Sequence, residues 1–408
     1  MAADTGSRLR TPDARPGIDA QLILLPRGTH LNVEARRLTR GTLGNSRGVC
    51  RSVCGWRLCG RVLAGLDPRP VRAYIPGMMT KRQRVEAVIR GHQPDRPPAS
   101  FWHHFGPTRI TGQAALDAHL EHVETYDLDF LKVMNDHPFP RGDVGIVRSA
   151  ADLKKIKPLP GDAGDFAGQL DLLRRLRKRL GDDILTCTTI FNSWAVLRKY
   201  VEPPSDKHGP PKIMGEDERD DAMTGLLKED RPAVKAALGV IGATCAAFAR
   251  ECIAAGADGV FLSVRDDWVD RHANGCGTYD EMVRVTDLRI LEAVAGAPFN
   301  LLHVCGRPRD FKRFTEYPVA VINWADRAAG PSIAYARDRT RPAIAGGVDN
   351  LETMPKGTPD DCAREVRDAL RQAKGRPIMI TPGCTYDPKA VPKENLEAIV
   401  AAVRSDGE

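Results

Sequence analysis

From residue 79 onward, short apolar runs alternate with segments in which apolar residues recur every three or four positions. A run of four to eight apolar residues predicts a strand, and the 3.6-residue period predicts a helix. Eight strands are predicted, at 98–104, 129–136, 183–190, 258–264, 299–305, 319–325, 342–349 and 377–384. The predicted helices are 80–90, 113–125, 166–180, 193–200, 231–255, 279–295, 307–315, 332–337, 359–373 and 393–403.

Several of the predicted strands, such as those containing 320–324 and 377–381, are nearly continuous apolar runs. Strands of this kind are typical of parallel sheets that helices cover on both sides. Eight strand–helix alternations in about 330 residues predict an α/β protein with a single (β/α)8 TIM barrel over residues 78–408. An open, doubly wound sheet is the alternative.

One stretch, 203–231, departs from the alternation because it is polar, charged and rich in Pro and Gly. A long insertion after a barrel strand lies on the catalytic face and often acts as a lid. A solvated loop without a role is an equally open interpretation.

The first 77 residues follow neither period. They hold thirteen Arg, no Lys and five acidic residues, whereas the rest of the chain mixes Lys and Arg. We expect a poorly structured, Arg-rich N-terminal extension, or a start-site artefact with the true start at Met78 or Met79. A targeting-like amphipathic arm is the alternative.

The formal net charge of +7 is concentrated in this extension, which leaves the remaining chain close to neutral. A neutral body without a basic patch argues against nucleic-acid binding. We see no apolar run of the roughly 20 residues that a membrane span needs. Ten cysteines in 408 residues are too sparse for a disulfide scaffold, so we expect reduced thiols and a cytoplasmic protein.

Polar residues with chemical potential gather at the carboxyl ends of the predicted strands, where a (β/α)8 barrel places its active site. They are His103, His104, Asn135, Asp136, Asp266, Asp267, His303, Cys305, Asn323, Asp326, Asp349 and Cys384. Their shared location, more than any one of them, predicts a single pocket.

Three of these residues form a candidate metal site. His303 and Cys305 stand two positions apart on one predicted strand, so their side chains point to the same face. Cys384, at the end of another strand, can supply a third soft ligand. One His and two Cys suit Zn²⁺, with the fourth position free for water or substrate. Taken singly, His303 would be a core histidine and Cys305 a buried apolar residue.

The order and spacing of several motifs resemble those of the uroporphyrinogen decarboxylase superfamily. The motifs are LDFLKVMND at 128–136, GADG at 256–259, LHVCG at 302–306, AGGVD at 345–349, PGC at 382–384 and PKENL at 392–396. The resemblance extends over nearly the whole chain after Met79, and it implies a (β/α)8 barrel.

Two branches of this superfamily differ at the residues that carry their chemistry. The decarboxylases bind a tetrapyrrole through arginines after the first strand, an aspartate after the second and a histidine after the eighth. Here no Arg precedes Arg109 in the first of these regions, Asp136 matches the aspartate, and Cys384 replaces the histidine. The cobamide-dependent methyltransferases instead carry a His-x-Cys pair and a distant Cys as zinc ligands, which His303, Cys305 and Cys384 match.

The resemblance therefore implies a zinc-dependent methyltransferase that moves a methyl group between a corrinoid and a zinc-activated thiol. It further implies a separate corrinoid protein as partner and, by analogy, a homodimer. The alternatives are a carboxy-lyase acting on a tetrapyrrole and a non-catalytic barrel that binds a corrinoid or a metal. We predict catalytic roles for Asp136 and Cys384. The predicted substrate contacts are His103, His104, Asn135, Asp266 and Asp349.

Overall fold

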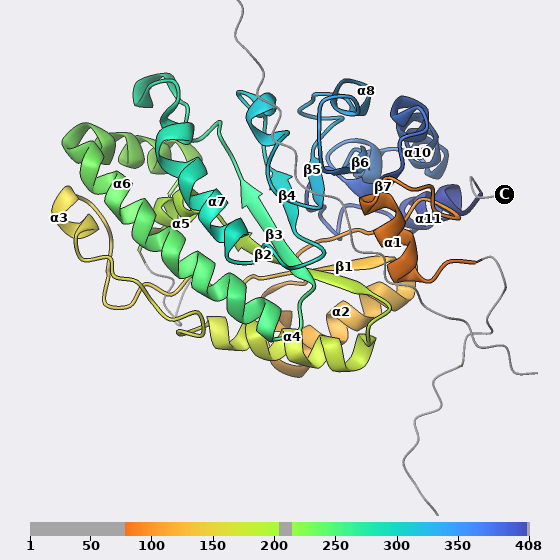
Figure 1. Ribbon diagram of the computed structural model, residues 1–408, viewed down its shortest axis with the longest axis horizontal. Helices are drawn as coiled ribbons and strands as arrows, with labels where there is room; N and C mark the ends of the chain where they lie inside the picture. The colour runs from red at the N-terminus through yellow and green to blue at the C-terminus, as the bar shows by residue number, and fades with distance from the viewer. Residues whose placement is uncertain (1–77, 204–213, 406–408) are drawn as a thin grey trace, which may run out of the picture. The chain divides into compact units, whose positions relative to one another are not determined.

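Seven parallel strands form one curled sheet in the computed structural model, which describes residues 78–203 and 214–405 (Figure 1). The predictions for residues 1–77 and for the centre of the 203–231 stretch lie outside the described residues. The strands follow the order of the chain from edge to edge. They are β1 (Phe130–Val133), β2 (Leu185–Phe191), β3 (Gly259–Val264), β4 (Leu301–Val304), β5 (Val321–Trp324), β6 (Ala343–Val348) and β7 (Ile378–Pro382).

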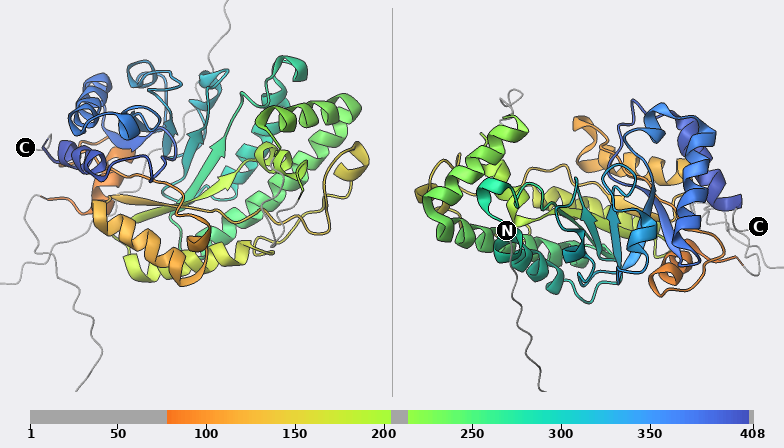
Figure 2. Two further views of the ribbon diagram at one scale, coloured as in Figure 1. Left: turned by 180° about the vertical axis from the view of Figure 1, so that it is seen from behind. Right: turned by 90° about the horizontal axis from the view of Figure 1, so that it is seen from above.

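Helices cover the outer face of this sheet (Figures 1 and 2), with α6 against β2 and β3 and α10 against β6 and β7. The α-helices are α1 (Lys81–Ile89), α2 (Gly112–Tyr126), α3 (Ala150–Leu153), α4 (Phe166–Leu180), α5 (Ser193–Tyr200), α6 (Glu216–Ala254), α7 (Arg284–Glu292), α8 (Ile333–Ala336), α9 (Thr353–Lys356), α10 (Pro359–Ala373) and α11 (Lys393–Ser405). Shorter turns are η1 (Pro107–Arg109), η2 (His272–Asn274), η3 (Tyr279–Val283, a π-helix) and η4 (Phe311–Phe314).

Seven of the eight predicted strands are confirmed, and the first is wrong as a strand. Within 98–104 the structure has a single bridge, which pairs Ala99 with Ile380 of β7. The local chemistry explains the difference. Pro97 and Pro98 have no N–H to donate to a ladder, and the N–H of Ala99 donates to the Asp129 carboxylate at 2.8 Å.

The same segment nevertheless bonds to both edges of the sheet. On one side, Ser100 donates its N–H to the Ile380 carbonyl at 3.2 Å, and Ile380 donates to the Pro98 carbonyl at 2.9 Å. On the other side, the Ser100 hydroxyl donates to the Phe130 carbonyl at 2.7 Å. Residues 98–100 therefore connect β1 to β7 without forming a regular strand.

The prediction of an irregular 203–231 loop is wrong for residues 216–229, which form the first half of α6. The helix is interrupted at Asp230, whose φ of −155° and ψ of 86° are not helical. Asp230 accepts a hydrogen bond from the N–H of Ala233 at 2.9 Å, so it caps a second helical half. The predicted helix start near 231 therefore corresponds to a real break.

By length and composition α6 could also cross a membrane, unlike any other helix in the described ranges. Its most apolar 18-residue window is 56% buried within the protein. A core helix that covers a sheet needs the same apolar composition as a membrane span, so the packing of α6 explains its composition.

The interior of the curled sheet holds a separate apolar cluster that includes Trp102, Phe130, Phe261 and Met379.

Candidate metal centre

The structure brings His303, Cys305 and Cys384 together. One ligand atom from each residue lies within 4.8 Å of the other two. His303 is on β4, Cys305 follows β4 directly, and Cys384 comes two residues after β7. Ligands of one tetrahedral Zn²⁺ lie about 3.5–4 Å apart, given metal–ligand bonds of about 2.0–2.3 Å. Small side-chain adjustments would therefore allow all three residues to share one ion.

Asn323, on β5, fixes the orientation of the His303 ring. The Asn323 amide nitrogen lies 3.1 Å from each of three oxygens, which belong to Ala345, Thr381 and Pro382. Its amide oxygen must then face His303, whose Nδ1 is 2.6 Å away. Nδ1 therefore carries the proton and donates it, which leaves the Nε2 lone pair free for a metal.

Close backbone packing places Cys384. A side chain on Gly383 would put its Cβ 2.5 Å from the Cα of Ala325, in the segment after β5. Only glycine allows the chain leaving β7 to pass so near the chain leaving β5. On the other side of the site, Gly306 follows Cys305 with φ of +70°, a conformation that favours glycine.

The two thiols influence each other strongly when no metal is present. The Cys305 thiol, acting as a hydrogen-bond donor, holds the pKa of Cys384 well below its usual range. The same contact, followed by burial, raises the pKa of Cys305 well above its usual range. Cys384 is therefore the first of the pair to become a thiolate, which is the form that binds metals.

The donor set fits a zinc ion. Two thiols and one imidazole are the ligand types that Zn²⁺ prefers, and the imidazole already has the hydrogen-bonded partner that such ligands normally have. The Phe261 ring stacks on the His303 ring with centroids 5.1 Å apart and provides an apolar wall. Sequence reasoning placed Asn323 at the pocket but missed its role, because that role depends on contacts with two other strands.

Two predicted residues form a hydrogen-bonded pair near the strand ends. His104 Nδ1 lies 2.7 Å from Asp136 Oδ1, and His104 is the more exposed partner. Burial alone would raise the pKa of Asp136, but the hydrogen bond from His104 and the nearby positive charges bring it below its usual value. Asp136 is therefore a carboxylate at neutral pH, and its catalytic role stays a prediction.

His103 lies in an aromatic cluster. Its ring contacts those of Phe105, His122 and Tyr386, with centroids 4.6–5.0 Å apart. Burial lowers the pKa of His103, although its hydrogen bond with the His104 carbonyl opposes this shift. A neutral imidazole in such a cluster can line a substrate pocket.

The other three predicted substrate contacts use polar atoms to hold local structure. The Asn135 amide donates to the Thr189 carbonyl at 3.1 Å. Asp266 is fully buried and accepts two backbone N–H groups from Arg309 and Asp310. Asp349 accepts the N–H groups of the two residues that follow Asn350. Direct substrate contact by these three residues stays a prediction.

A cavity of about 600 Å³ opens beside Asp136. The loop after β1 and helix α5 form its walls, and Phe191, at the end of β2, contributes an exposed ring. Arg219 of α6 lies at its edge. This space adjoins the strand ends and is large enough for a small organic substrate.

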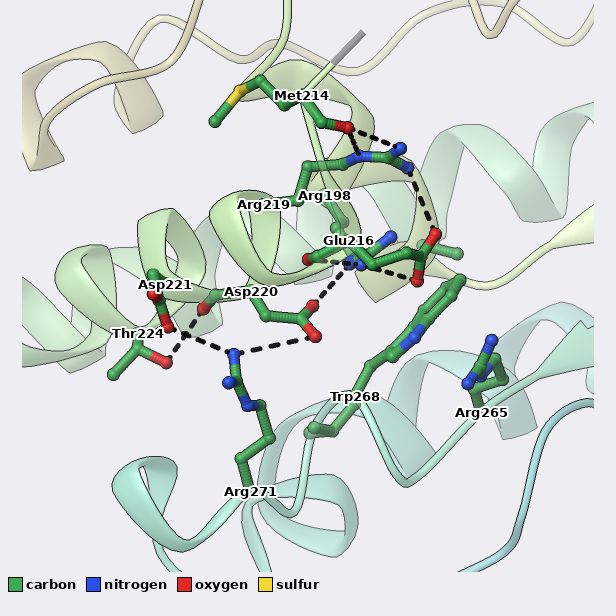
Figure 3. A network of polar contacts seen from close by, with 12 residues as sticks. Arg198, Met214, Glu216, Arg219, Asp220, Asp221, Thr224, Arg265, Trp268 and Arg271 are labelled. Carbon is green, nitrogen blue, oxygen red and sulfur yellow. Dashed lines mark hydrogen bonds and ion pairs between the residues drawn. The ribbon is translucent and has the colours of Figure 1, made fainter.

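A cation–π stack joins α5 and α6 to the loop beside Cys305 (Figure 3). The Trp268 ring lies between the guanidinium groups of Arg198 and Arg265, 3.9 and 4.0 Å from its centroid. Arg198 also pairs with Asp220 of α6 at 2.6 Å. Because a Cβ on Gly306 would come within 2.7 Å of Arg265, this stack reaches the metal site loop.

Comparison with known proteins identifies the family. The family model described as uroporphyrinogen decarboxylase (URO-D) matches residues 133–405, which include all three candidate metal ligands. The chain belongs to the uroporphyrinogen decarboxylase family. No curated protein matches this member of the family.

A solved structure resembles this uroporphyrinogen decarboxylase family member in fold. A methyltransferase from Methanosarcina mazei matches with a TM-score of 0.60 and 16% identity, over 80% of this chain and 98% of its own. A B12-independent methionine synthase from Shewanella sp. W3-18-1, in complex with selenomethionine, matches with a TM-score of 0.38 and 13% identity. That match covers 58% of this chain and 67% of the synthase.

Proposed function

We propose that this protein is a zinc-dependent methyltransferase that moves a methyl group between a corrinoid and a thiol. The observation that carries the proposal is the convergence of His303, Cys305 and Cys384 within 4.8 Å, with the His303 tautomer already set by Asn323. The fold shared with a protein named a methyltransferase agrees with this proposal.

The residues in and around the site would have separate roles. His303, Cys305 and Cys384 would hold the ion, and the ion when bound supplies the Lewis acidity that keeps a substrate thiol as its thiolate. Asn323 orients the imidazole, and the Phe261 ring excludes water from one side of it. The hydrogen-bonded pair of His104 and Asp136 would contact the substrate near the strand ends.

The proposal includes the surroundings of the site. Residues 98–100 would close the curled sheet into a (β/α)8 barrel with the site at its carboxyl end. The corrinoid would arrive on a separate protein, and the thiol as a small molecule. All seven cysteines within residues 78–203 and 214–405 are free, which is in keeping with a reducing cytoplasm.

Metal analysis of purified protein tests the site. We expect about one zinc per chain in the wild type, loss of most of it in Cys384→Ser, and full retention in Cys276→Ser. Cys276 is an exposed free cysteine and serves as the matched control. Equal zinc in the wild type and Cys384→Ser would remove the proposed centre.

Methyl transfer is tested with methylcobalamin and 2-mercaptoethanol. The sulfur–carbon bond forms as the cobalt–carbon bond breaks, the electron pair stays on cobalt, and the thiol proton goes to the buffer. The visible spectrum of the corrinoid reports the reaction. A zinc-loaded wild type that gives no rate above the protein-free reaction would count against the activity.

Tetrapyrrole decarboxylation is the second candidate because Asp136 is a carboxylate beside a 600 Å³ cavity. It would stabilise positive charge on a pyrrolic substrate. Incubation with uroporphyrinogen discriminates the two, since formation of coproporphyrinogen would favour the decarboxylase. Ligand or metal binding without either turnover would favour a non-catalytic binding protein.

A further inference from the structure

A buried ammonium group without a carboxylate partner lies inside the curled sheet. Lys132, on β1, is 4% exposed. Its Nζ contacts the Met134 sulfur at 3.0 Å and lies 4.7 Å from the centre of the Phe261 ring. Within residues 78–203 and 214–405 it forms no ion pair. A thioether and a ring face are weak partners for a charge removed from water.

A second well-buried lysine, Lys81, shows what is unusual about Lys132. Lys81, on α1, is 7% exposed, but its Nζ lies 2.7 Å from the Asp127 carboxylate and 2.7 Å from the Leu128 carbonyl. A buried ammonium normally has such oxygen partners, because leaving it unpaired costs several kcal/mol. The Lys132 ammonium therefore has no negatively charged hydrogen-bond partner among the described residues. A bound anionic ligand would provide a negative charge close to it.

The charge lies close to the candidate metal centre. Lys132 packs on the Phe261 ring, and His303 stacks on the same ring with centroids 5.1 Å apart. Burial lowers the pKa of Lys132 to about 8, and Cys384 is first among the negative groups that raise it again. Cys187, Asp136 and then Cys305 act in the same direction. Two of these groups, Cys384 and Cys305, belong to the candidate metal centre.

We propose that Lys132 is a positioning residue that balances the negative charge of an anionic fourth ligand at the metal centre. A divalent ion with two thiolates is neutral, so a bound substrate thiolate makes the site anionic. In a low-dielectric interior that charge is stabilised by a nearby unpaired cation. The inference rests on the proposed function and defines its ligand class: Lys132 favours thiolates over neutral ligands.

The test compares an anionic and a neutral ligand on the Co²⁺-substituted protein, whose visible spectrum reports ligand binding. Wild type, Lys132→Met and Lys81→Met are each titrated with 2-mercaptoethanol and, separately, with imidazole. A unit charge at roughly 10 Å and an effective dielectric of about 20 corresponds to about a tenfold change in affinity. We expect Lys132→Met to lose about tenfold for the thiol and to change less than about twofold for imidazole.

The control variant Lys81→Met should keep both affinities, although it removes the ion pair of a buried lysine with Asp127. Lys132→Arg preserves the charge and should keep the thiol affinity within about threefold, and Lys132→Gln provides a neutral variant with a polar tip should the methionine variant not fold. Equal losses for thiol and imidazole, or no loss in either neutral variant, would overturn the charge-balancing role. A wild type that binds no Co²⁺ would instead refute the proposed function.

Discussion

At the scale of single residues, Asn323 determines what His303 can do. Its amide can satisfy the oxygens of Ala345, Thr381 and Pro382 in one orientation only, and that orientation turns its oxygen toward His303. The lone pair of His303 Nε2, the nitrogen that would bind the proposed ion, is therefore free without any metal present. Without the hydrogen bond to Asn323, the His303 ring could rotate, and neither its tautomer nor its orientation would be fixed.

We expect Asn323→Ala to weaken zinc binding by about 10–100-fold, the range typical for loss of a partner behind a metal ligand. Competition with a chromophoric chelator measures the affinity. Asn395→Ala is the control, because Asn395 is equally buried and donates to the Met354 and Gly357 carbonyls away from the site. Similar affinities for Asn323→Ala and wild type would contradict the orienting role.

Residue types were more predictable than residue roles. The spacing of His303 and Cys305 on one strand follows from sequence alone, and Cys384 could be added as a third soft ligand. The role of Asn323 depends on three oxygens contributed by β6 and β7, and no spacing within a strand encodes that arrangement. The absence of an ion pair at Lys132 likewise depends on the fold. The sequence around this lysine does not show whether a carboxylate from another element lies beside it.

At the scale of elements, the approach of the segments that follow β5 and β7 sets the position of Cys384. We expect Gly383→Ala to force Ala325 and the β7 end apart, because the added Cβ would lie 2.5 Å from the Ala325 Cα. Overpacking of this kind costs about 1–3 kcal/mol. Zinc affinity should fall about tenfold or more as Cys384 is displaced.

The control for this change is Gly296→Ala, since a Cβ at Gly296 meets no heavy atom within 4 Å. Chelator competition and thermal unfolding, measured on both variants, separate a local shift from general destabilisation. Unchanged zinc affinity in Gly383→Ala would show that the β7 end tolerates the shift without moving its ligand.

Element boundaries were predictable where local signals agreed. Seven strands and the break at Asp230 follow from apolar runs and a capping residue. The failure of the first strand has a partial signal in the sequence, because Pro97 and Pro98 cannot donate to a ladder. The bond from the N–H of Ala99 to the Asp129 carboxylate has no such signal and depends on the fold. The helix at 216–229 was missed because its polar surface conceals a short apolar stripe that includes Met223, Leu226 and Leu227.

At the scale of the whole molecule, a buried carboxyl group makes stability depend on pH. Asp287, on α7, accepts hydrogen bonds from the hydroxyls of Tyr279 and Tyr317 at 2.5 and 3.2 Å. Complete burial raises the pKa of Asp287 to about 7, against the opposing effect of these hydrogen bonds and of Arg284. The folded protein therefore holds a proton there that the unfolded chain, with an ordinary pKa of 3.8, has released.

Because the folded state binds more protons between about pH 4 and pH 7, the free energy of unfolding falls as pH rises through this window. The loss is on the order of a few kcal/mol and is complete above the folded pKa. We expect Asp287→Asn to have a flatter pH profile, with its largest gain relative to wild type at pH 8. Urea unfolding at pH 5 and pH 8 measures this; parallel profiles would assign the pH dependence to other groups.

The bridge between Ala99 and Ile380 has a consequence for how the protein reaches its active form. It joins segments from opposite ends of the folded chain, so the entropy of closing a very long loop must be overcome before the pair can form. Cys384 lies just beyond Ile380 and reaches His303 only when this end of the chain has docked. The proposed three-ligand site would therefore be complete only after β7 has docked, late in folding.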